Sequence, residues 1–306
     1  MSQHPFARAS LVATVVLTAA GSVQAHGVIG RRMFIEALAA EDANVKNELG
    51  LPRGDFLRLP DGTTRSMDVS LEKELYPHRL SIIAETGRIT RTGPDASGWD
   101  NIEVGLKWEA WINAPHEFAV SAAMFGVLPT GSASVTDPET AVRPMLVAAK
   151  GFGDLGVAWL RPLALQGDVG YERSVSGSGG QLIYDAVLMY SLPYLNHWVR
   201  RADNGRQTEE TLRTGLSWGS LWGNVFPFVE LNARRPIGNA QGETSSLLRS
   251  GACWMGKYVQ VSVAADVNLA APAGARRHGI TVLADWFIDE FLPGFGKTPF
   301  GRRGRE

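Results

Sequence analysis

The sequence is poor in the features that mark several common classes of protein. It contains a single cysteine, Cys253, so no disulfide can form within the chain or stabilise an exported fold. Beyond residue 25 it has no run of about 18 apolar residues, which excludes a membrane-spanning helix. Its formal net charge is only −1, and this near-neutrality argues against nucleic acid as a partner.

The first 25 residues have the layout of a secretory signal peptide. Arg8 supplies a positive charge, residues 11–20 are apolar, and Val23 and Ala25 are the small residues of a cleavage site. The apolar run is too short to remain in a membrane as an anchor. The sequence therefore predicts an exported protein that is cleaved after Ala25.

Residues 101–128 show a pattern that most of the chain repeats. Apolar residues occupy every second position from Ile102 to Ile112, and polar residues such as Glu103 and Lys107 lie between them. Side chains of a strand alternate between two faces, so this stretch predicts a hairpin with one apolar and one charged face. Strong or weaker versions of the pattern occupy twelve segments: residues 67–75, 78–85, 101–112, 118–128, 145–149, 163–172, 182–190, 212–221, 225–234, 247–254, 259–269 and 280–289.

A secreted soluble sandwich or barrel would also alternate, and it is the main alternative for the fold. Three features favour a membrane barrel instead. The chain has a signal peptide, and many of its strands reach the length of about ten residues that crosses a bilayer at a tilt. Charged residues such as Glu103, Lys107, Asp168 and Asp266 also lie deep inside the strands, which suits a polar lumen. The sequence thus predicts an all-β fold, a single antiparallel transmembrane β-barrel of about 12 strands.

The chain shows no linker that would divide the mature protein into separate domains. Residues 26–65 lack the alternation and are expected to form an irregular or helical arm at the periplasmic mouth or in the lumen. Residues 66–300 are expected to form the barrel, and residues 301–306 a basic tail.

Several short motifs resemble those of a group of proteobacterial outer-membrane proteins. This group is similar to the barrel family named for the MetA pathway of phenol degradation, whose members are regarded mostly as transporter-like. The resemblance implies an outer-membrane barrel and supplies neither a substrate nor catalytic residues. One departure is that the chain continues past Phe300, whereas many such barrels end on an aromatic residue. The motifs lie at residues 26–34, 98–101, 150–155, 160–162, 190–195, 226–230 and 292–300.

The polar face of the strands supplies the candidate functional residues. We expect a pore or transporter for small polar or hydrophobic solutes, with outer-membrane lipid and the barrel-assembly machinery as partners and with no cofactor. The expected lining is acid-rich, which favours cations or polar solutes. Side chains of a barrel this narrow can also close its lumen, so a structural or binding barrel remains possible. The residues expected to line the lumen are Glu103, Lys107, Glu109, Asp168, Glu172, Asp185, Glu230 and Asp266.

Two enzymatic alternatives rest on single residues. Ser217 lies in a G-x-S-x-G motif and could be the nucleophile of a lipid hydrolase mounted on the barrel wall. His26 would become the N-terminus after cleavage and could bind copper through its amine and imidazole. The remaining histidines show no spacing typical of a metal site.

Overall fold

A computed structural model describes residues 27–300 except 94, 137, 178, 201–214, 217–219, 239–243 and 271–277. The expected signal peptide, the basic tail, His26 and Ser217 lie outside the described residues.

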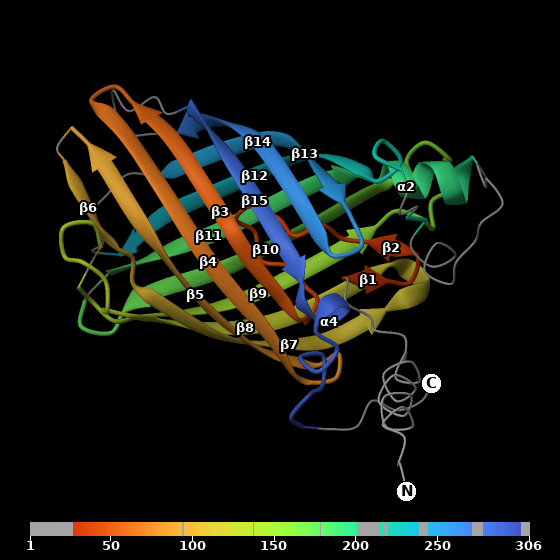
Figure 1. The fold of residues 1–306 in the computed structure, drawn as a ribbon, viewed down its shortest axis with the longest axis horizontal. Coiled ribbons are helices and arrows are strands. Elements are labelled where there is room, and N and C mark those ends of the chain that lie inside the picture. The colour runs from red at the N-terminus through yellow and green to blue at the C-terminus, as the bar shows by residue number, and fades with distance from the viewer. Residues whose placement is uncertain are drawn as a thin grey trace, which may run out of the picture.

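The described strands form a closed antiparallel barrel (Figure 1). Twelve strands make the ring, which closes because β4 pairs with both β3 and β5. A thirteenth strand, β6 (Ala96–Trp99), pairs with the end of β5 and lies outside the ring. The ring strands are β3 (Glu48–Leu59), β4 (Gly62–Tyr76), β5 (Leu80–Thr92), β7 (Ile102–Asn113), β8 (Phe118–Leu128), β9 (Ala141–Gly151), β10 (Leu163–Ser174), β11 (Gly179–Tyr190), β12 (Val225–Gly238), β13 (Ser245–Met255), β14 (Val259–Ala270) and β15 (His278–Phe287).

The remaining short elements are not part of the ring. The first two strands, β1 (Val28–Ile29) and β2 (Arg32–Met33), form a small separate hairpin. The segment η1 (Ala114–His116) turns the chain from β7 into β8. Between β11 and β12, α2 (Leu192–Tyr194) continues into η2 (Leu195–Val199), and α4 (Ile288–Phe291) follows β15. No helix in the described part of the chain is long and apolar enough to cross a membrane.

The predicted fold class is confirmed, but the predicted strands and the described ring strands differ at one place. β11 pairs directly with β12, so the described ring contains no counterpart of the strand expected at residues 212–221, most of which lies outside the described residues. Its place in the count is taken by β3, which lies within the segment expected to be an arm. The sequence does not predict β3, because its register shifts between Gly50 and Arg53 and this shift breaks the alternation of apolar and polar residues.

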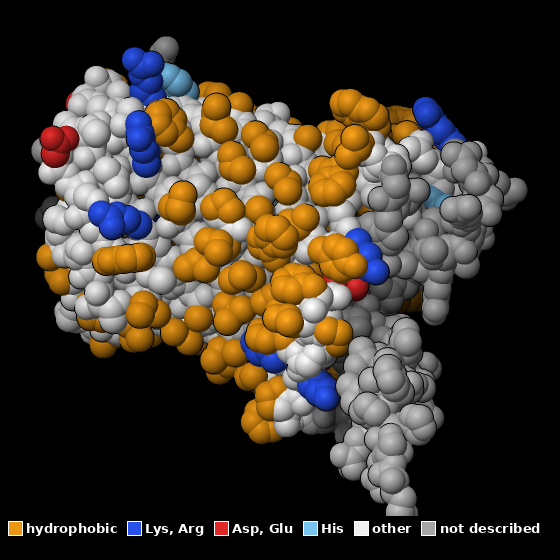
Figure 2. Space-filling model, in the orientation of Figure 1, with side chains coloured by type: hydrophobic (Ala, Val, Ile, Leu, Met, Phe, Trp, Pro, Cys, Tyr) orange, Lys and Arg blue, Asp and Glu red, His pale blue; other side chains and the backbone are white. Residues whose placement is uncertain are grey.

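The two faces of the wall follow the predicted alternation in β7. Leu106 and Trp108 are about half exposed on the outside (49% and 54%), whereas Lys107 and Glu109 are buried inside. A register shift between Glu109 and Trp111 then reverses the alternation. Ile112, expected to face outward, packs against the internal core instead. Figure 2 shows hydrophobic side chains spread over the visible wall, with Lys and Arg mainly toward its ends.

The arm that precedes β3 lies inside the barrel. It ends at residue 47 rather than at the expected residue 65, because β3 begins at Glu48. Eight of its apolar residues are buried in one cluster with inward-facing side chains of the wall. The arm contributes Ile29, Met33, Phe34, Ile35, Ala37, Leu38, Ala40 and Ala43, and the wall includes Ala119, Val147, Ala149, Ala164, Val187, Met189, Phe226, Phe228, Cys253, Met255, Leu283 and Phe287.

Candidate functional site in the barrel lumen

The candidate site is a cavity of about 1090 Å³ inside the barrel. Its mouth includes residues of the loops that precede β7 and β9, such as Asn101 and Glu139, and its floor is formed by the arm from Leu38 to Glu41. Thirteen acidic and five basic side chains line it. The cavity is therefore polar, with an excess of carboxylates that would attract cations.

Polar side chains of the wall hold the backbone of the arm. The carboxylate of Glu230, on β12, accepts hydrogen bonds from the backbone N–H groups of Leu38 (2.9 Å), Ala39 (2.7 Å) and Ala40 (3.0 Å). Asp168, on β10, accepts one from Glu41 N–H at 2.8 Å. An irregular chain buried in a barrel needs such partners, because an unsatisfied buried N–H group is costly.

Two neutral side chains provide further anchors for the arm. Gln166 donates from Nε2 to the carbonyl of Ile35 at 3.0 Å. The Gln260 side chain binds both backbone groups of Glu36. It accepts a hydrogen bond from the Glu36 N–H at 3.1 Å and donates one to the Glu36 carbonyl at 2.9 Å. A charged side chain of the wall adds to these anchors, since Arg53 of β3 donates to the carbonyl of Leu38. The arm is thus fixed by donors and acceptors from several strands.

Along the inner part of the cavity, buried charges of the arm and wall form one ion cluster. Lys107 Nζ, on β7, contacts Glu41 (2.8 Å), Glu72 (3.0 Å) and Asp42 (3.4 Å). Lys46 Nζ, on the arm, pairs with Asp42 at 2.6 Å, with Glu48 at 2.7 Å and with Glu36. Together with the neighbouring Asp285, the ion cluster comprises the carboxylates of Glu36, Glu41, Asp42, Glu48, Glu72 and Asp285 and the ammonium groups of Lys46 and Lys107.

Nearer the mouth, arginines link the acidic side chains of different strands. Arg143, on β9, lies between Glu103 of β7 and Glu172 of β10, and its Nη1 is 3.0 Å from Glu172. On the opposite part of the ring, Arg249 of β13 lies 3.5 Å from Asp266 and 3.6 Å from Asp55. These pairs fix side chains that line the cavity, among them Glu103, Glu172 and Asp55.

All eight residues expected to line the lumen lie on the inner face of the wall, but they divide into three groups. Glu103, Glu172 and Asp185 line the cavity. Lys107, Glu109, Asp168 and Glu230 instead bind the arm or its side chains, and Asp266 accepts a hydrogen bond from Thr281 at 2.7 Å. Whether any of them guides a solute stays a prediction.

The sequence prediction missed the arginines and the acidic residues of the arm. Arg143 and Arg249 occupy inward positions of weakly alternating strands, and the same alternation could have identified them. Glu36, Glu41 and Asp42 carry no such signal, because the arm has no period of two.

The opposite end of the lumen is closed around Arg32 of the arm. This buried guanidinium donates to Glu117 Oε2 at 3.1 Å and to the carbonyls of Pro162 (2.9 Å) and Arg161. It also lies over the ring of Tyr194 at 3.9 Å from the ring centroid. Burial raises the pKa of Tyr194 to about 12, so the phenol stays neutral.

A second, smaller cavity of about 390 Å³ lies at this end of the barrel. Gly30, Arg31 and Tyr194 are among the residues that line it, and it shares no lining residue with the large cavity. The arm and its apolar cluster separate the two. The described lining residues therefore show no connection between the two cavities.

No known family model matches this chain, and no curated protein matches it. The resemblance to the MetA-like family therefore stays a prediction. Among solved structures, the chain is similar to a KdgM porin with 10% identity and a TM-score of 0.44, over 77% of this chain and 97% of that one. It is similar to a NanC porin with 8% identity and a TM-score of 0.47, over 78% and 98%. The LpxR protein from Salmonella typhimurium gives 10% identity and a TM-score of 0.46, over 78% and 99%.

Proposed function

We propose that this protein is an outer-membrane barrel that transports small cationic or polar solutes, and that its arm closes the lumen when no solute passes. The observation that supports this most directly is the acid-rich cavity that ends on the arm. At the cavity floor, the arm from Leu38 to Glu41 is held by hydrogen bonds and ion pairs that can be exchanged for water or solute, whereas its apolar cluster must move as a unit. A passage through the barrel would require the arm to shift.

The outer surface supports the membrane location. Large apolar side chains are exposed on the outward face of strands all around the ring. Monomeric soluble proteins rarely expose apolar surface on this scale, whereas a lipid-facing band of this kind is typical of outer-membrane barrels. Together with the predicted signal peptide, this favours the outer membrane. Representative outward residues are Val104, Leu106, Trp108, Leu146, Leu165, Leu188, Val263 and Ile280.

Uptake into proteoliposomes tests the transport proposal. We expect wild-type protein to admit an aliphatic diamine faster than a dicarboxylate of similar size. Glu230→Gln should raise uptake, because the amide retains only one of the two oxygens that hold the arm. Asp266→Asn is the matched control, since Asp266 bonds to Thr281 and Arg249 rather than to the arm.

Charge selectivity provides a second measurement. Glu103→Arg introduces a positive charge at the cavity wall and should shift the preference toward anions. If neither wild type nor Glu230→Gln admits any solute while both are folded, transport is contradicted. The second candidate function, a binding barrel with a closed lumen, would then be favoured. The apolar cluster that seals the lumen around the arm is the observation that supports this candidate.

A further inference from the structure

The ion cluster holds more negative than positive groups, although most of it is buried. Six carboxylates share two ammonium groups. A buried charge without a partner is strongly unfavourable, so the excess must be balanced by protons or by a bound cation. Three of the carboxylates have a geometry that suits a cation.

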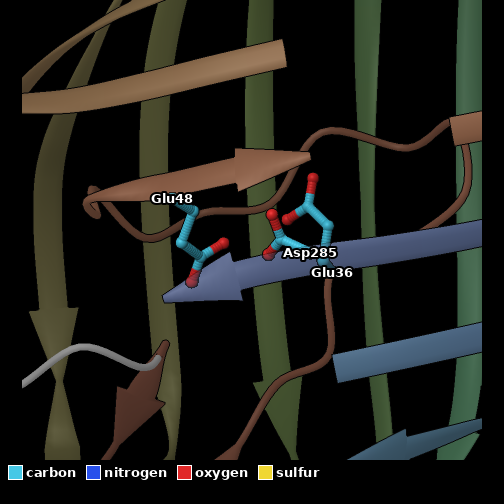
Figure 3. A group of neighbouring side chains, drawn as sticks. All are labelled: Glu36, Glu48 and Asp285. Carbon is cyan, nitrogen blue, oxygen red and sulfur yellow. The ribbon is translucent and has the colours of Figure 1, made fainter. Parts of the chain in front are cut away.

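These three carboxylates come from three separate elements. Glu36 belongs to the arm, Glu48 begins β3, and Asp285 lies near the end of β15 (Figure 3). One oxygen of each lies within 4.8 Å of the others. Calcium takes carboxylate oxygens at about 2.3–2.6 Å, so oxygens up to about 5 Å apart can share one ion. The spacing is therefore compatible with a single calcium ion.

The wall fixes the arm's contribution to this group. Gln260 holds the backbone of Glu36 through both its N–H and its carbonyl. In the sheet, Gln260 is the direct cross-strand partner of Asp285. On the other side of β15, Asp285 pairs with Gly50, two residues beyond Glu48 in β3. The three carboxylates are thus brought together by sheet register and by a side-chain clamp on the backbone.

Among the described residues, Asp285 forms no direct ion pair, whereas Glu36 and Glu48 each pair with Lys46. The Asp285 side chain is 3% exposed, and within the described part of the chain its Oδ2 has no hydrogen-bond partner. A buried carboxylate oxygen without a partner, in a side chain grouped with two further carboxylates, is what a cation ligand would provide.

The group can also be reached from the solvent. Glu36, Glu48 and Asp285 all line the large cavity, which opens at the mouth of the barrel. A hydrated cation can therefore approach along a path lined mostly by acidic groups. Such a lining would raise the local concentration of divalent cations.

We propose that Glu36, Glu48 and Asp285 form a calcium site that ties the arm to β3 and β15. Calcium accepts irregular sets of oxygen ligands, whereas magnesium requires near-octahedral geometry and gives up water reluctantly. Three carboxylates from three elements, one of them held by a backbone clamp, fit calcium better. The cavity leaves room for water to complete the coordination.

Calorimetric titration of the refolded full chain in detergent, freed of metal with a chelator, tests the site. We expect wild-type protein to bind one equivalent of Ca²⁺, with Mg²⁺ binding more weakly. Asp285→Asn and Glu36→Gln should each weaken Ca²⁺ binding about ten-fold or more, because each removes a charged ligand. Asp266→Asn is the control, an inward carboxylate outside the group, and should bind Ca²⁺ like wild type.

The same samples show whether a variant is folded and whether calcium bridges the arm to the wall. A variant counts as folded if its unheated sample migrates on a gel like unheated wild-type protein. Ca²⁺ should raise the Tm of wild type and of Asp266→Asn but not that of Asp285→Asn. The proposal is overturned if wild type binds no Ca²⁺ up to about 1 mM, the weak end of known protein sites. It is also overturned if folded Asp285→Asn binds as tightly as wild type. Neither result depends on transport, so the uptake experiments can fail independently.

Discussion

The two halves of the lumen differ in how they are filled. At the end that carries Arg32 and Glu117, the arm packs against apolar wall residues. At the other end the same strands enclose a large cavity lined mostly by charged and polar groups. Between the two halves lie the side chains that bind the arm's backbone, such as Gln166 and Glu230.

The change from apolar to charged inward residues can be followed along individual strands. The inward residues of β9 pass from Ala149 and Val147 in the packed half to Arg143 at the cavity. Those of β10 pass from Ala164 through Asp168 to Glu172. The same strands can therefore pack tightly against the arm in one half and line a polar cavity in the other. This is possible because successive side chains point to opposite faces, so the inward residues can change while the outward residues stay apolar.

The largest contrast should come from truncating one phenylalanine in each half. Phe226→Ala removes a fully buried ring from the packed half and should lower the free energy of unfolding by about 3–5 kcal/mol. Phe125→Ala removes a buried ring from a much smaller cluster that borders the cavity, so the loss should be smaller because water from the cavity can fill the space. Urea unfolding from lipid vesicles measures both. Equal losses would mean that the two halves are packed alike.

A second prediction compares the outer face with the lumen at neighbouring positions of β7. Val104→Arg places a charge on the lipid-facing side and should cost about 2–4 kcal/mol if it lies near the bilayer midplane. Glu103→Arg, one residue earlier, faces the cavity and should leave insertion intact. The folded fraction on unheated gels measures both. Loss of insertion in Glu103→Arg alone would invert the assignment of faces.

The third prediction concerns the boundary between the halves. Glu230→Ala removes the acceptor of three arm N–H groups and should cost about 1–3 kcal/mol, the range for leaving a buried polar group unsatisfied. Hydrogen exchange should rise at residues 38–40 while the strands stay protected. Unchanged exchange at these residues would show that Glu230 does not hold the arm.

The smallest effect should come from an exposed pair outside both halves. A hydrogen bond from His116 lowers the pKa of the Asp154 carboxyl, and Lys150 adds to the effect. Because the folded-state pKa is depressed, the stabilisation exists above the unfolded pKa of about 3.9 and is lost as pH falls through the folded value. Asp154→Asn should cost less than about 1 kcal/mol at neutral pH, and nothing in strong acid. Urea unfolding at both pH values measures it, and a loss that persisted in acid would contradict the ionic origin.

The alternation allowed much of the wall to be predicted and little of what fills it. Leu106 and Lys107 were assigned to the correct faces because a strand has a period of two. The bulge before Trp111 and the register shift in β3 were missed, because a bulge inserts a residue without a sequence signature as clear as the alternation. Of the eight residues expected to line a pore, four bind the arm or its side chains instead.

By itself, the sequence determined that this protein is an antiparallel barrel with an apolar outside and a polar inside, because side-chain direction in a strand follows from position along the chain. Only the tertiary structure decided that the arm enters the lumen and that its acidic residues meet Lys107, Glu48 and Asp285. The arm has no periodicity of its own, and its partners come from strands far apart in sequence. Its path is therefore set by which buried N–H groups and charges find partners inside the closed ring.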